Sequence, residues 1–73
     1  MPDTRAKDLL DEAVASVKQG ELHLARQRAT VAELEAQPKK RLEAAAAKAV
    51  LRSMEESQAL RVARVERLRA ELR

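Results

Sequence analysis

The segment "LEAQPKKRLEAAAAKAV", residues 34–50, decides the fold, because it holds the only proline away from the N-terminus. A proline within a helix loses a hydrogen bond and clashes with the preceding turn, at a cost of about 3 kcal/mol, but it is tolerated at the first position of a new helix. The segment therefore predicts a turn over residues 37–40, between a first helix of about 4–36 and a second of about 41–72. The alternative is a kink at Pro38 within one longer helix.

Apolar residues before this turn follow a heptad pattern. One row recurs every seven residues and consists of Leu10, Val17, Leu24 and Val31. A second row, three residues further along, consists of Ala6, Ala13, Gly20, Gln27 and Leu34. These rows predict the seam of a coiled-coil-like helix, with small residues that let a partner helix approach closely. At its start, Asp3 or Thr4 is expected to cap the helix.

The second half has a seam of its own. Its rows are Ala44, Leu51, Gln58, Val65 and Leu72, and Ala47, Met54, Arg61 and Leu68. Continued past the turn, the first frame would instead place Pro38, Arg41 and Lys48 in the core, where unpaired charge is costly to bury. The change of frame favours two helices packed as an antiparallel hairpin.

The distribution of charge also favours a hairpin. Residues 1–17 carry a net charge of −2, and residues 57–73 carry a net charge of +3. An antiparallel arrangement lays these segments side by side, and each also suits the dipole of its own helix. Surface ion pairs contribute roughly 0–1 kcal/mol each, so they favour an orientation more than they add stability.

The chain is small and its apolar residues are small too. It has 73 residues, no cysteine and no aromatic residue, and alanine is its commonest apolar residue. We expect a single all-α domain over residues 1–73 whose core is too small to be stable without association. Two hairpins could pair by two-fold symmetry into a four-helix bundle, or one hairpin could dock on a different protein. The residues do not choose between these partners.

The predicted interface consists mostly of seam residues: Leu10, Val14, Val17, Gly20, Leu24, Val31, Leu34, Leu51, Met54, Val65 and Leu68. A second contact is predicted from apolar residues beside or outside the seam: Leu9, Val14, Leu22, Leu60 and Val62. The predicted function is therefore protein–protein interaction or regulation through apolar helix faces.

Polar residues and a glycine interrupt the seam. Gln27, Gln58 and Arg61 could fix the register or the partner, but we favour the interpretation that they lie at seam edges with their polar groups in water. Gly20 is either a packing notch opposite Met54 or Gln58, or a weak point costing up to about 1 kcal/mol against alanine. We favour the notch, because Gly20 falls in the row of small residues.

No residue pattern indicates catalysis. His23 is the only histidine, and a solvated or edge-packed role is its simplest interpretation. Consecutive acids, such as Asp11 and Glu12, diverge by about 100° on a helix and do not converge on a substrate. Serine nucleophile arrangements, glycine-rich phosphate loops and metal-ligand spacings are absent from the sequence. We therefore predict that the protein is not an enzyme and uses no cofactor or metal.

The basic balance, a net charge of +3 with a pI near 9.8, raises nucleic acid as an alternative partner. The residues that would bind RNA or DNA are Arg26, Arg28, Lys39, Lys40, Arg41, Arg64 and Arg67. Against this alternative, no aromatic residue can stack on a base, and the arginines of the second helix spread around it rather than forming a stripe. Peripheral membrane binding is a weaker third possibility.

The longest stretch without a charge is five residues, Ala13 to Val17, against the roughly 20 needed to span a bilayer. We expect neither a transmembrane segment nor a secretory precursor. The expected location is the cytoplasm, although the lack of cysteine is weak support for it.

Two segments carry a resemblance: "GELHLARQRATVAELEAQ", residues 20–37, and "MEESQALRVARVERLRAEL", residues 54–72. They resemble a set of small uncharacterised bacterial helical proteins with an ARQR and AELE first helix and an EESQAL and RLRAEL second helix. The resemblance implies a bacterial cytoplasmic protein and implies no activity. The connector departs from that pattern, since Gln37, Pro38 and a basic run stand where a glycine and a capping threonine are usual.

Overall fold

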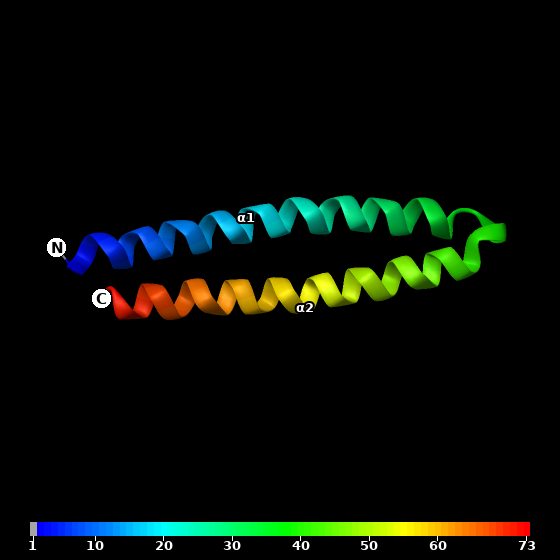
Figure 1. The fold of residues 1–73 in the computed structure, drawn as a ribbon. Coiled ribbons are helices and arrows are strands. Elements are labelled where there is room, and N and C mark those ends of the chain that lie inside the picture. Colours follow the sequence, from blue (N-terminus) through cyan, green and yellow to red (C-terminus); the bar gives the residue numbers. More distant parts are fainter. Residues whose placement is uncertain (1) are drawn as a thin grey trace.

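The computed structural model describes the backbone of residues 2–73 and the side chains from Arg5 onward. Two helices, α1 (Pro2–Glu35) and α2 (Arg41–Glu71), are joined by a short 3-10 helix, η1 (Pro38–Lys40). Figure 1 shows α1 and α2 running side by side in opposite directions, with both termini at one end. The hairpin is 59 Å long, whereas one unbroken helix of this length would reach roughly 110 Å. The predicted fold-back is confirmed, and a kinked single helix is excluded.

Local geometry at Pro38 explains the turn. Gln37 is extended, with φ −109° and ψ 106°, because a following proline disfavours the helical conformation. The Gln37 N–H donates to the Leu34 carbonyl at 3.1 Å and closes α1, and the Lys40 N–H donates to the Gln37 carbonyl at 3.0 Å. Lys39 and Lys40 thus lie in η1, between the helices, and Lys40 forms an ion pair with Glu43 in the first turn of α2.

The predicted boundaries hold to within two residues. Helix α1 begins at Pro2 and ends at Glu35, and α2 begins at Arg41 and ends at Glu71. The side chains of Asp3 and Thr4, which were expected to cap α1, lie outside the described residues. Most of the described chain is therefore helical, and no strand occurs among residues 2–73.

Both pairs of heptad rows face each other across the hairpin. Their described members are buried or half-buried, except Leu72, which is 40% exposed at the end of the chain. The buried apolar core consists of Ala13, Leu24, Val31, Ala44, Ala47 and Val65. The predicted seam is confirmed, and half of its buried apolar residues are alanines. No described side chain reaches less than 2% exposure, so the core is thin.

The predicted attraction between the acidic and basic ends of the chain does not involve direct ion pairs. Within the described residues no ion pair joins residues 5–17 to residues 57–73; the pairs between the helices are Arg28–Glu55 and Glu35–Lys48, nearer the turn. Asp8 and Asp11 occupy outward heptad positions, which do not face α2. Glu12 lines a hollow together with Arg61 and Arg64 but forms no ion pair with either.

Candidate protein interaction surface

Apart from Val14, which lies on one side of the seam, the residues predicted for the interface lie in the seam inside one hairpin. Gly20, Leu24, Val31 and Val65 are buried between α1 and α2, and the other predicted members are half-buried. The structure therefore brings these residues together within a single chain. A partner chain can reach only those that also open onto a side of the hairpin.

Two seam glutamines link the helices directly. The Gln58 side chain is 8% exposed, and its Nε2 donates to the Val17 carbonyl at 2.9 Å. In the other direction, Gln27 Nε2 donates to the Ala47 carbonyl at 2.9 Å. Arg61 donates to Gln58 Oε1 at 3.4 Å. The favoured interpretation, with the polar groups in water, is wrong for the glutamines, because each side chain reaches a backbone carbonyl across the seam.

Gly20 is the notch that receives Gln58. A Cβ atom at residue 20 would lie 2.7 Å from Gln58 Cδ, closer than unbonded carbon atoms approach. A side chain at residue 20 would therefore displace the Gln58 amide. This confirms the packing notch that was favoured for Gly20.

The two sides of the seam differ in chemistry. We name one the Val62 flank; its residues are Val14, Glu21, Arg28 and Glu35 from α1 and Lys48, Glu55, Val62 and Arg69 from α2. The other is the His23 flank, with Glu12, Ser16, His23, Ser53, Ser57 and Arg64. In heptad geometry such positions lie on opposite sides of the seam.

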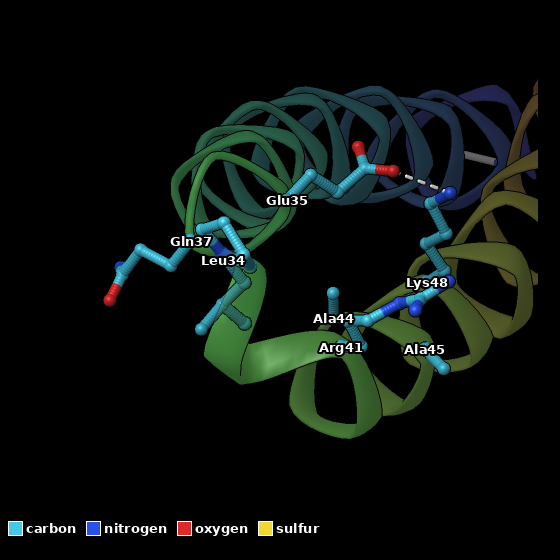
Figure 2. A pocket seen from close by; sticks show the side chains of 8 residues that line it. Leu34, Glu35, Gln37, Arg41, Ala44, Ala45 and Lys48 are labelled. Atoms are coloured by element: carbon cyan, nitrogen blue, oxygen red, sulfur yellow. Dashed lines mark ion pairs between the residues drawn. The ribbon is translucent and has the colours of Figure 1, made fainter.

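The Val62 flank carries the larger hollows. One, of about 380 Å³, has Val14, Val17, Val62 and Val65 in its lining, and the next, of about 420 Å³, shares Val62 and Glu66 with it. A third, of about 540 Å³, lies at the turn end, where the Glu35–Lys48 ion pair spans the gap between the helices (Figure 2). Leu34 and Ala44 line this hollow, and the Gln37 side chain points away from it.

The His23 flank is narrower and more polar. Its two hollows measure about 120 and 150 Å³ and are lined mainly by serine, arginine, glutamate and His23. Ala13, Gly20 and Met54 are the only apolar residues or glycines in their lining. The hollows of this flank offer little apolar surface to a partner chain.

The predicted second contact is dispersed. Leu22 and Leu60 are 53% and 73% exposed, but their heptad positions turn them away from the seam on different sides of the molecule. Val14 and Val62 share a hollow, whereas Leu9 lies beside the seam toward the His23 flank. Only the valine pair therefore forms part of a continuous surface.

Sequence reasoning missed two features of this surface. Leu42 and Val50 are exposed apolar residues that were not singled out, although neither belongs to a heptad row. The cross-helix ion pairs were also missed. Their signal was the alternation of charge at the positions flanking the seam, which becomes readable only once the offset between the helices is known.

The basic residues proposed for nucleic-acid binding do not form one surface. Arg28 forms an ion pair with Glu55 at 3.6 Å, and Lys40 forms one with Glu43 at 3.8 Å. Lys39 and Arg41 lie at the turn, while Arg26 and the remaining arginines of the set, Arg64 and Arg67, lie along the two helices. All seven are exposed.

Among the described residues, no group of three or more histidine, aspartate or glutamate side chains could hold a metal ion. Over the same part of the chain, neither helix is apolar enough over a sufficient length to cross a membrane. Comparison with family models, with curated proteins and with solved structures gives no match to this chain.

Proposed function

We propose that this protein is a small non-enzymatic interaction protein that works by associating with another helical chain, in the first instance a second copy of itself. The observation that carries the proposal is the distribution of large apolar side chains. Among the described residues, Leu24, Val31 and Val65 are buried and seven large apolar side chains are half-buried, whereas seven others are exposed: Leu9, Leu22, Leu42, Val50, Leu60, Val62 and Leu72. A chain that leaves so few large apolar side chains fully buried gains stability by covering some of the others.

The thin core supports the same proposal. No disulfide can reinforce it, since the chain has no cysteine, and association is one of the few remaining ways to stabilise so small a scaffold. The hollows on the Val62 flank are open sides of the hairpin rather than enclosed sites for a substrate.

Sedimentation equilibrium over a wide range of protein concentration tests this function. We expect a particle of twice the 8.1 kDa chain mass, dissociating to the chain mass on dilution. Circular dichroism on the same samples should lose helicity as the chains separate, because folding and association are coupled. A chain of monomeric mass and full helicity at every concentration would contradict self-association.

Nucleic-acid binding is the competing proposal, and the exposed cations at the turn favour it. Lys39, Lys40 and Arg41 are consecutive and all exposed, so they place positive charge at one end of the hairpin. Titration of a labelled RNA hairpin and a labelled DNA duplex at low ionic strength decides the matter. Binding that weakens steeply with added salt would support this proposal, and no binding at low salt would remove it.

A cytoplasmic, bacterial protein remains part of the proposal. Its support is the resemblance of residues 20–37 and 54–72 to small bacterial helical proteins. Fractionation of cells that express the tagged chain would test the location, and recovery with the membrane fraction would oppose it.

A further inference from the structure

The Val62 flank has an apolar floor bordered by both signs of charge. Val17 and Val65 lie in the floor of one hollow, with Lys18 and Glu21 on the α1 side and Glu66 and Arg69 on the α2 side. Further along, Arg28 and Glu55 border the adjoining hollow. A partner for this surface must supply apolar side chains between charges of both signs.

On this flank, charged residues of α1 lie at the same height along the hairpin as oppositely charged residues of α2. Arg28 contacts Glu55 and Glu35 contacts Lys48; the two pairs are one heptad apart on both helices. Lys18 and Glu66 line one hollow from opposite helices, together with Glu21 and Arg69. At the levels of Arg28 and Glu35, one helix offers a base and the other an acid.

We infer that a second copy of the chain docks its Val62 flank on this one, related by a two-fold axis parallel to the length of the hairpin. The inference rests on the self-association proposed above and names its surface and symmetry. Rotation about such an axis places α1 of the copy over α2 at the same level. Each opposite-charge pair within the hairpin then recurs between the chains, because Arg28 of the copy faces Glu55 and Glu35 of the copy faces Lys48.

The size of the surface suits a second copy. The hairpin measures 59 Å by 15 Å between its outermost Cα atoms, so the area of one side is close to the roughly 800 Å² that each partner buries in a standard interface. The result is a four-helix bundle in which every helix lies antiparallel to both neighbours. Val14, Val17, Val62 and Val65 of both copies meet in the core of the bundle, toward the end that holds the chain termini.

Mixing two charge variants tests the symmetry. Arg28→Glu gives a chain with two acids at this level, and Glu55→Arg gives a chain with two bases. Each homodimer then opposes like charges, whereas both contacts between chains in the mixed dimer are attractive. Native mass spectrometry of the mixture should show the mixed dimer enriched about fivefold over random pairing, the effect of two exposed ion pairs.

Arg26→Glu and Glu56→Arg are the matched control pair. They make the same charge changes at exposed positions away from the Val62 flank, so any general attraction between oppositely changed chains appears there too. Enrichment confined to the Arg28 and Glu55 variants supports the inference. Equal enrichment in both pairs, or none, overturns the proposed geometry while self-association stands, and monomers throughout would overturn both proposals.

A second pair of variants tests the surface without changing an ion pair. Val62→Glu places a negative charge in the apolar hollow beside Glu21 and Glu66, and we expect the dimer to dissociate at a protein concentration at least tenfold higher. Leu60→Glu is the control: Leu60 is more exposed, at 73% against 39%, but lies off the flank and should leave dissociation unchanged. The reverse result, with Leu60→Glu the more disruptive, would overturn the inference.

Discussion

Gln58 shows how a polar residue can serve a seam of small side chains. Its amide fits into the space left by Gly20 and donates to the Val17 carbonyl across the helix pair. Gln27 donates in the opposite direction, to Ala47. Both bonds depend on the axial offset between the helices, because a shift by one turn would carry each amide about 5.4 Å from its carbonyl. The glutamines therefore specify the register of the hairpin.

Because Gln58 occupies the notch at Gly20, the effect of Gly20→Ala on the free energy of unfolding should change sign when Gln58 is replaced. In the native chain, Gly20→Ala should lower the free energy of unfolding by about 1 kcal/mol, since the displaced buried amide costs about 1–3 kcal/mol and the gain in helix propensity is only about 1 kcal/mol. In a Gln58→Ala background the same change should raise it by about 1 kcal/mol. Urea unfolding at one fixed protein concentration measures both values. Equal stabilisation in the two backgrounds would mean that Gln58 does not occupy the notch.

At the scale of the elements, the heptad rows and the turn were predictable from sequence. A row such as Leu10, Val17 and Leu24 identifies the buried face of its own helix, and Pro38 determines where that helix ends. The roles of the glutamines and the Val62 flank were not predictable. They depend on which residues of α2 lie level with which residues of α1, a property that neither helix encodes alone.

Two leucines on one helix test the seam. Leu24 is 7% exposed and Leu22 is 53% exposed, although they are only two residues apart. Leu24→Ala should lower the free energy of unfolding by about 2–3 kcal/mol, through lost burial and the cavity left behind. Leu22→Ala should change it by no more than about 0.5 kcal/mol. Thermal unfolding followed by circular dichroism makes the comparison, and similar losses in both variants would refute the assignment of the seam.

The turn makes a smaller contribution to stability than the seam. Pro38→Ala should lower the free energy of unfolding by about 0.4–1 kcal/mol, because the proline restricts the unfolded chain in a conformation that the turn already adopts. The hairpin itself should persist, since the change of heptad frame remains. Denaturant unfolding gives the energy; a variant more stable than the native chain would show that Pro38 is strained.

At the scale of the whole molecule, shape and association are linked. The described helices bury few large side chains, and half of the buried apolar core is alanine. Such a hairpin is long and narrow, so its sides are its most extensive surfaces. Pairing along the length doubles the mass with little change in length, whereas end-to-end association or an opened hairpin would lengthen the particle.

Small-angle X-ray scattering, with the mass determined on the same eluting peak, tests this account most directly. The account predicts a particle of twice the chain mass whose longest dimension stays close to the 59 Å of one hairpin. A particle about 110 Å long would contradict the side-by-side pairing of hairpins. At the mass of a single chain it would also contradict the turn at Pro38, because 73 residues in one unbroken helix reach this length.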